Sequence, residues 1–164
     1  MNKQQPIKLF VMDVDGTLTD GKVYIGSNGE LMKAFSIKDG YGIRNLLIPA
    51  GIIPVIITGR KSDILEYRCS ELGITDIYQN VDDKFVVLKK VCHEYGISLS
   101  EVAYIGDDMN DMSCMIKLIE HQGVVGCPAD ATKAVKSVAT YISEKNGGDG
   151  AVRDFIDYIL GDQI

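Results

Sequence analysis

Short, nearly continuous apolar runs recur along the chain, and they constrain its fold more than any other feature of the sequence. They cover residues 7–12, 54–57, 102–105 and 124–127, and residues 140–143 are a candidate fifth run. Strands that are apolar on both faces are typical of a sheet covered by helices on both sides, and such sheets are parallel. We therefore expect a parallel sheet whose strands are joined by crossover helices.

The segments between these runs carry signals for helix ends. Ser62 can cap a helix over residues 63–72, and Asp82 or Asp83 can cap a helix over residues 84–95. The alternation of strand and helix predicts a doubly wound, Rossmann-like α/β fold. Further helices are expected over residues 112–121, 129–138 and 151–160.

One segment interrupts the alternation directly after the first strand. Residues 23–35 read VYIGSNGELMKAF, which is two short β-type runs around the loop from Gly26 to Gly29. A loop with glycines between two such runs is typical of a β-hairpin. We therefore expect a hairpin insertion that lies outside the main sheet.

Charge and hydropathy exclude several classes of function. The formal net charge of −6 disfavours general binding to nucleic acids or to anionic membranes. No apolar run approaches the roughly 20 residues of a membrane span, and the first ten residues lack a signal-peptide pattern. We expect a cytoplasmic protein whose four separated cysteines stay reduced. The two histidines have no partner at ligand spacing, which disfavours a zinc site.

Polar residues follow the apolar runs at the places where ligands bind in this class of fold. In an open α/β sheet, ligands bind outside the carboxyl ends of the strands, so side chains distant in the sequence can converge there. The strand ends carry Asp13 and Asp15, then Thr58 and Arg60, then Asp107 and Asp108, and Lys84 lies in the first turn of the helix before the third of these.

The ordered motifs DVDGT, IITG, Lys84 and GDDMND resemble the four motifs of the haloacid dehalogenase superfamily of phosphatases. The resemblance implies that Asp13 is the nucleophile and forms an aspartyl-phosphate, while Asp15 serves as general acid and then general base. It also implies a magnesium ion held by the Asp13 and Asp107 carboxylates and the backbone carbonyl of Asp15.

The same resemblance gives supporting roles to further residues of the motifs. Thr58 and Lys84 would hold the phosphoryl oxygens as charge spreads over them. Asp111 either supports the metal site or Lys84, or is an acid placed favourably at a helix N-terminus. The role of Asp108 is divided in the same way. A solvated surface turn is the alternative for Asp13 and Asp15, and the other motifs argue against it.

The intervals between the motifs leave little room for the cap domain that many members of the superfamily carry. An independent cap would need about 50 residues or more of its own. Thr58 follows Asp13 by 45 residues, which must hold the hairpin and a helix, and Lys84 follows Thr58 by 26. We therefore expect one domain over residues 1–164 without a cap, and a site that is open unless a neighbouring subunit covers it.

A closer resemblance spans nearly the whole chain. The segments DVDGTLTDG, GELMKAFSIKDGYGIR, IITGRK, YRCSELGI, VAYIGDDMND and GGDGAVRDF are similar to those of the capless 3-deoxy-D-manno-octulosonate 8-phosphate phosphatases, which act in lipopolysaccharide sugar synthesis. The resemblance implies hydrolysis of a phosphorylated 2-keto-3-deoxy sugar acid, octulosonate first and a nonulosonate (sialic acid or KDN) 9-phosphate as the alternative. It also implies a homotetramer built by the hairpin, in which neighbouring subunits cover each other's sites.

The resemblance further implies residues that bind the sugar acid. It places Arg44, Arg60, Arg68 and the backbone near Asp39 and Gly40 at the substrate, beside Asp15 and Lys84, and guanidinium groups suit carboxylate recognition. For Arg60 and Arg68 the alternative is an exposed surface charge.

Two residues depart from the pattern of these phosphatases. Asp149 stands in GGDGAVRD where the family often has GGRGAVRE, and Glu71 replaces a smaller residue. These departures weaken the assignment of one specific octulosonate.

Two functions other than catalysis are the alternatives: a non-hydrolytic phosphate-binding module and an oligomerisation module. Receiver domains also use an acid pair, a threonine and a lysine with magnesium. Their acid pair is contiguous, whereas Asp13 and Asp15 are separated by one residue. The second acid at this spacing supplies the proton shuttle that hydrolysis needs, which favours an enzyme.

Overall fold

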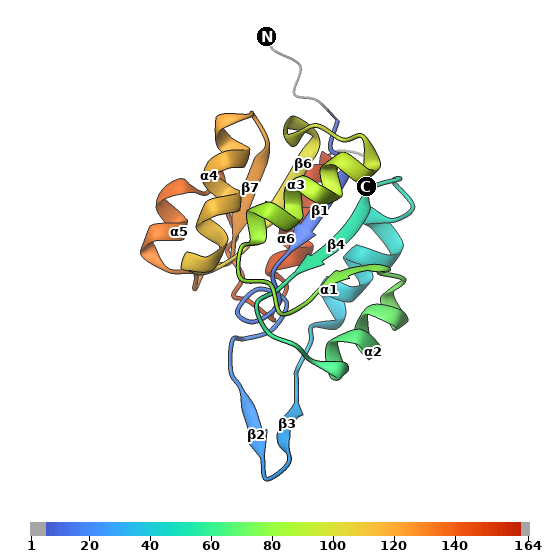
Figure 1. The fold of residues 1–164 in the computed structure, drawn as a ribbon, viewed down its shortest axis with the longest axis vertical. Coiled ribbons are helices and arrows are strands. Elements are labelled where there is room, and N and C mark those ends of the chain that lie inside the picture. Colours follow the sequence, from blue (N-terminus) through green and yellow to red (C-terminus); the bar gives the residue numbers. More distant parts are fainter. Residues whose placement is uncertain (1–5, 162–164) are drawn as a thin grey trace.

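The structure, a computed structural model, describes residues 6–161 and contains a parallel sheet of six strands (Figure 1). The strand order is β5-β4-β1-β6-β7-β8. The chain moves outward from β1 on one side and returns to continue on the other, so the order reverses between β1 and β6. This confirms the doubly wound fold. The strands are β1 (Leu9–Met12), β4 (Ile53–Ile57), β5 (Asp76–Tyr78), β6 (Val102–Ile105), β7 (Val124–Cys127) and β8 (Tyr141–Ile142).

Helices cover both faces of this sheet, as the apolar strands predict. On β1, Phe10 and Met12 pack into one core cluster and Leu9 and Val11 into the other. The first cluster lies under α1 (Ile37–Tyr41), the π-helical turn η1 (Gly42–Leu47), α2 (Asp63–Leu72) and α6 (Ala151–Leu160). The second lies under α3 (Lys84–Tyr95), α4 (Met112–Glu120) and α5 (Lys133–Val138). Two short 3-10 turns, η2 (Leu99–Glu101) and η3 (Met109–Asp111), flank β6.

The predicted helix caps are present. The Ser62 hydroxyl accepts the N–H of Leu65 at the start of α2, and the Asp83 carboxylate accepts two N–H groups at the start of α3. Both helices end at a glycine in the left-handed conformation, which lacks the steric penalty of a Cβ atom. The local sequence therefore sets the limits of these two helices.

Two elements differ from the prediction. The helix expected to begin at residue 129 begins at Lys133, because the preceding residues form a turn in which the N–H of Thr132 donates to the carbonyl of Asp107 (2.9 Å). The edge strand β5 was not predicted, since its three half-buried residues, Asp76 to Tyr78, form no continuous apolar run. In residues 6–161 no helix is long and apolar enough to cross a membrane.

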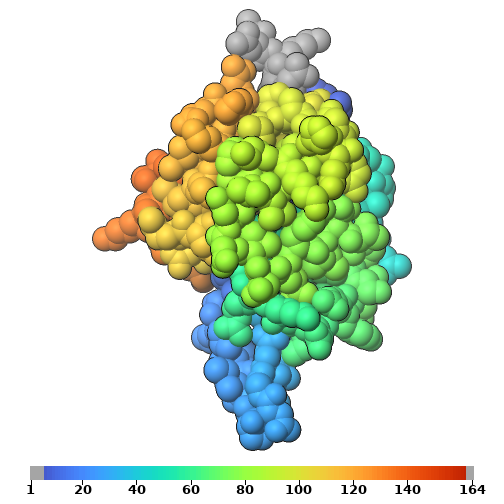
Figure 2. All heavy atoms as spheres, in the orientation of Figure 1, coloured from blue at the N-terminus to red at the C-terminus, as the bar shows by residue number. Residues whose placement is uncertain are grey.

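The predicted hairpin extends past the carboxyl ends of the main strands and projects from the body of the molecule (Figures 1 and 2). It consists of β2 (Tyr24–Gly26) and β3 (Gly29–Met32), which pair antiparallel. Ile25 and Leu31 are 75% and 65% exposed on it. An exposed apolar surface of this kind is typical of a contact with another protein.

The C-terminal helix is tied to α1 by a buried carboxylate. Asp39 is buried, and its Oδ1 accepts the N–H of Arg153 (2.8 Å) in the first turn of α6. The residue at the N-cap position of α6 is Gly150, which has no side chain to cap the helix. Burial raises the pKa of Asp39 to about 6, against the effect of the backbone N–H groups of α6. Asp39 therefore caps a helix that is more than 100 residues away in the sequence.

We predict that at pH 5, where burial keeps the Asp39 carboxyl mostly protonated in the folded protein, Asp39→Ala lowers the free energy of unfolding by about 1–2 kcal/mol, because the first turn of α6 loses its acceptor. Asp39→Asn should be at least as stable as the wild type at pH 8, since the amide oxygen can still accept and the buried charge, whose raised pKa costs stability at that pH, is removed. Urea denaturation of both variants would measure the effect. Asp149→Ala is the matched control, because it removes an exposed acid near the same helix start. A loss in Asp149→Ala as large as that in Asp39→Ala would contradict the capping role.

Candidate active site

The point where the strand order reverses is an open pocket of about 510 Å³. Three of the predicted strand ends contribute to it, because the parallel strands β1, β4 and β6 are adjacent in the sheet. The pocket is lined by Asp13, Asp15 and Gly21, by Thr58, Gly59 and Arg60, and by Asp107, Asp108, Met109 and Asn110. The structure thus brings six of the predicted site residues to one place.

A close approach of two loops sets the distance between Asp13 and Asp107. Gly16, with φ +94°, turns the chain after β1, and a Cβ atom there would collide with the Asp107 carboxylate. The Thr17 hydroxyl donates to Oδ1 of the same carboxylate (2.8 Å). Only a glycine allows this turn and this contact together. The glycine of the DVDGT motif therefore has a steric role in joining the first and third strand ends.

Lys84 lies beneath the pocket and is buried, with 1% of its surface exposed. Its Nζ lies 2.8 Å from Oδ1 of Asp13 and 2.7 Å from Oδ1 of Asp111. Burial opposes the charge of this ammonium, but the two carboxylates outweigh burial and hold the pKa of Lys84 above its usual value. The predicted convergence of Lys84 and Asp13 is therefore present in the structure.

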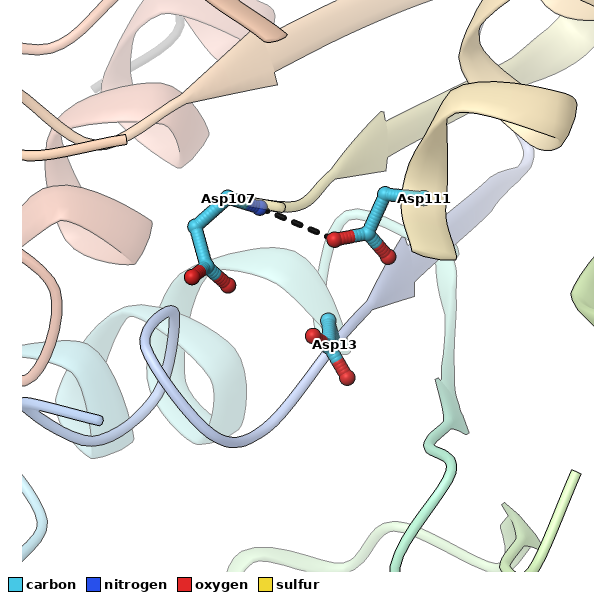
Figure 3. A group of neighbouring side chains, drawn as sticks. All are labelled: Asp13, Asp107 and Asp111. Carbon is cyan, nitrogen blue, oxygen red and sulfur yellow. Dashed lines mark hydrogen bonds between the residues drawn. The ribbon is translucent and has the colours of Figure 1, made fainter. Parts of the chain in front are cut away.

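Asp111 is bound through both of its carboxylate oxygens. Oδ1 accepts from Lys84 and from the hydroxyl of the fully buried Tyr104 (2.6 Å). Oδ2 accepts the backbone N–H groups of Asp107 (2.9 Å) and Asp108 (3.2 Å); the bond from Asp107 is the dashed line in Figure 3. These contacts favour the interpretation that Asp111 supports Lys84 and the loop after β6 over a simple helix N-terminal acid.

Within residues 6–161, the cluster of Asp13, Asp107 and Asp111 carries more negative charge than its neighbouring ammonium neutralises. Carboxylate oxygens of Asp13, Asp107 and Asp111 lie within 4.8 Å of one another, and one ammonium, that of Lys84, faces them. Burial and the neighbouring carboxylates raise the pKa of Asp13 to about 6 and that of Asp107 to about 7. Two uncompensated charges on oxygen donors fit a divalent cation such as magnesium. Asp13 and Asp107 are the residues suited to hold it, since Asp111 is fully engaged.

Asp15 is held by Arg60, which the sequence analysis predicts, and by Lys33, which it does not identify. Its Oδ1 is 2.5 Å from Nζ of Lys33, and its Oδ2 is 3.8 Å from Nε of Arg60. Lys33 also lies 3.0 Å from Oε1 of Glu30. Glu30 and Lys33 both belong to the GELMKAF segment. The similarity of that segment to the phosphatase family was the one sequence signal that could have pointed to them. The contact between Lys33 and Asp15 depends on the path of the chain from the hairpin back to the main sheet, and the sequence pattern does not define that path. Tyr104 was also missed, since it is one residue of an apolar strand.

Besides the buried Lys84, four predicted substrate-binding residues lie outside the pocket as a single chain forms it. Arg44 donates to the backbone carbonyl of Glu71 (3.0 Å), and Arg68 pairs with the Glu71 carboxylate (3.2 Å). Gly40 lies so close to Arg68 that a Cβ atom on residue 40 would collide with the guanidinium group. Asp39 is the fourth, and its side chain caps α6. Of the predicted basic residues that bind the sugar acid, Arg60 alone lines the pocket within residues 6–161.

Comparisons with known proteins agree with this geometry. The model of the haloacid dehalogenase-like hydrolase family matches residues 56–156. The 3-deoxy-D-manno-octulosonate 8-phosphate phosphatase KdsC of Escherichia coli (strain K12) is 42% identical over 158 residues, which cover 96% of this chain and 81% of that protein. Its counterpart in Salmonella typhimurium is 41% identical over 160 residues, which cover 98% and 82%.

Two solved structures are similar over nearly the same range. The crystal structure of the 3-deoxy-D-manno-octulosonate 8-phosphate phosphatase from Yersinia pestis has a TM-score of 0.89 at 42% identity, and it covers 94% of this chain and 81% of its own. The enzyme from Moraxella catarrhalis, in complex with a magnesium ion, a phosphate ion and a KDO molecule, has a TM-score of 0.87 at 42% identity, with 96% and 87% covered.

We predict that Asp107→Asn stabilises the protein in EDTA at pH 8 by on the order of 1 kcal/mol. A raised carboxyl pKa costs stability once the pH exceeds the unfolded value, and the cost is complete above about pH 7 for Asp107. The amide removes this cost and keeps an oxygen to accept from Thr17. At pH 5 the gain should shrink, because the wild-type carboxyl is then mostly protonated. Thermal unfolding would measure both values.

With magnesium present, the wild type should become more stable than Asp107→Asn, the reverse of the result in EDTA. It should raise the melting temperature of the wild type and have little effect on Asp107→Asn. Asp20→Asn, which removes an exposed acid close to the pocket, is the control and should respond to magnesium as the wild type does. Lower stability of Asp107→Asn than wild type in EDTA at pH 8 would contradict the repulsion within the carboxylate cluster.

Proposed function

The chain belongs to the haloacid dehalogenase-like hydrolases, and we propose on this premise that it is a magnesium-dependent phosphatase of 3-deoxy-D-manno-octulosonate 8-phosphate. The observation that carries the proposal is the pairing of Asp13 with the buried Lys84, beside a pocket that Asp13 lines together with Asp15 and Asp107. The likeness to phosphatases named for this substrate, at 42% identity over nearly the whole chain, supports the substrate class.

The residues of the pocket can carry out hydrolysis in two steps. The Asp13 carboxylate attacks phosphorus, the bond to the sugar oxygen breaks, and Asp15 gives its proton to that oxygen. Asp15 then takes a proton from water, which attacks the aspartyl-phosphate, releases inorganic phosphate and restores Asp13. Thr58 and Lys84 hold the phosphoryl oxygens. When bound by Asp13, Asp107 and the backbone carbonyl of Asp15, magnesium offsets the repulsion between carboxylate and phosphate.

We further propose that the working enzyme is a homotetramer in which the hairpins meet. Two features support this: the exposed Ile25 and Leu31 on the hairpin, and the open pocket that lacks most of the predicted arginines. Arg44 and Arg68 would reach the sugar acid from a neighbouring subunit. A 2-keto sugar acid carries a carboxylate besides its phosphate, and guanidinium groups suit both. We place the reaction in the cytoplasmic synthesis of lipopolysaccharide sugars.

A nonulosonate 9-phosphate is the alternative substrate, because Glu71 and Asp149 depart from the pattern of the octulosonate phosphatases. The Glu71 carboxylate pairs with Arg68, whereas Arg44 donates to the backbone carbonyl of Glu71, so the side chain that departs from the pattern contacts one of the predicted arginines. Asp149 adds a second acid where the related phosphatases often carry arginine. A screen that compares the two sugar phosphates at equal concentration would separate the candidates.

We predict that wild-type protein releases inorganic phosphate in the presence of magnesium and that EDTA abolishes the release. Asp13→Asn should lower kcat by at least about 1,000-fold, because the amide cannot attack phosphorus. Asp20→Asn is the matched control for loss of one acidic charge and should retain activity. Absence of release from any sugar phosphate would instead support a non-hydrolytic phosphate-binding or oligomerisation module.

Light scattering coupled to size exclusion tests the assembly. We expect a wild-type mass four times that of one chain, and a smaller species for the double variant Ile25→Asp, Leu31→Asp, because charge on the hairpin opposes burial there. Activity of that variant should fall through a higher KM. A wild-type protein that is monomeric and fully active would contradict the proposed role of the neighbouring subunit.

A further inference from the structure

The last strand of the hairpin returns to the pocket and delivers a lysine to Asp15. Lys33 follows directly after β3, and its side chain is only 2% exposed. Its Nζ is 2.5 Å from Oδ1 of Asp15 and 3.0 Å from Oε1 of Glu30. A buried ammonium is costly unless carboxylates pair with it. Lys33 is thus held between two carboxylates rather than free to move in solvent.

Glu30 is itself fixed by a separate element. Its Oε2 accepts a hydrogen bond from the hydroxyl of Ser62, the same hydroxyl that caps α2 by accepting the N–H of Leu65 (3.3 Å). Oε1 of Glu30 also lies 3.7 Å from Nη2 of Arg60. The position of Lys33 is therefore anchored to the start of α2, and it does not depend on a ligand in the pocket.

The contact of Lys33 with Asp15 fixes one side of a catalytic carboxylate. Oδ1 of Asp15 is occupied by Lys33, while Oδ2 lies on the side of Arg60, which lines the pocket with Asp15. Lys33 does not line the pocket formed by the described residues, and both of its carboxylate partners are on this chain, so its contact with the pocket is the one it makes to Asp15. General acid catalysis depends on the carboxyl group lying within hydrogen-bond reach of the atom that receives the proton.

We propose that Lys33 is a positioning residue that holds the Asp15 carboxyl group in the orientation from which it exchanges protons with the leaving group and with water. The proposal rests on the phosphatase function proposed above. In the first step the proton passes from Asp15 to the leaving oxygen as the bond between phosphorus and that oxygen breaks. Lys33 keeps its own protons throughout and forms no bond to the substrate.

The arrangement gives each acid of the DVDGT motif its own ammonium. Lys84 of α3 contacts Asp13, and Lys33 of the hairpin contacts Asp15. The two lysines come from different elements and have different second partners, Asp111 and Glu30. The nucleophile and the proton donor are therefore oriented by independent contacts, and a change at Lys33 should disturb proton transfer while leaving the nucleophile in place.

The test compares two esters that differ in their need for a proton. The leaving group of p-nitrophenyl phosphate departs without protonation, whereas the sugar alkoxide of 3-deoxy-D-manno-octulosonate 8-phosphate requires it. For Lys33→Met we expect kcat/KM on the sugar phosphate to fall about 10- to 100-fold, and on the aryl ester by less than about threefold. The comparison rests on kcat/KM, which reports the first step, because the second step is common to the two esters and also uses Asp15. Lys22→Met, on an exposed lysine paired with Asp20, is the matched control and should match wild type on both esters.

Each possible result supports or overturns the positioning role of Lys33. An equal loss of kcat/KM on the two esters, or no loss of kcat/KM, would overturn the positioning role of Lys33 and leave the phosphatase function intact. A wild-type protein inactive on both esters would overturn the phosphatase function, and the inference with it. If Lys33→Met does not fold, Glu30→Gln takes its place. It keeps an oxygen to accept from Ser62 but removes the charge that anchors Lys33, and it should give the same preferential loss on the sugar phosphate. No preferential loss in Glu30→Gln would overturn the proposal.

Discussion

A buried ammonium ion needs carboxylate partners, and Lys84 finds two at the point where the sheet reverses its strand order. Asp13 comes from the end of β1, Asp111 from the turn after β6, and Lys84 from the start of α3, so one charge cluster joins three elements. Loss of one partner of a buried ion pair costs about 3–5 kcal/mol. The contacts of Asp111 with Tyr104 and with the loop after β6 extend the cluster into the core. The pocket is therefore shaped by the requirement to neutralise these charges.

Much of the fold and part of the site could be predicted from the sequence. Apolar runs determine which segments enter the sheet, and parallel strands place their carboxyl ends together, so the meeting of Asp13, Thr58 and Asp107 follows from local patterns. The edge strand β5 escaped prediction because it has no such pattern. Lys33 and Tyr104 escaped because their contacts depend on tertiary packing, which spacing along the chain does not reveal.

The arginines predicted to bind substrate show a different limit of prediction from sequence. Arg60 follows a strand of the sheet, and the topology alone brings it to the pocket. Arg44 and Arg68 belong to η1 and α2, where Glu71 pairs with them at a distance from Asp13. The motif resemblance selected all three without distinguishing a residue that its own chain brings to the pocket from residues that lie outside it. The position of a residue relative to the sheet is the physical criterion that separates the two groups.

The return of β3 to the pocket also has a consequence for how the hairpin can vary. Side chains alternate between the two faces of a strand. The number of residues between Gly29 and Lys33 therefore determines the face of the hairpin on which the Lys33 ammonium lies. One residue added or removed there would turn Lys33 away from Asp15, whereas the loop at the far tip carries no such restriction. Natural variants of this hairpin should therefore differ in the length of the tip and agree in the length of the base.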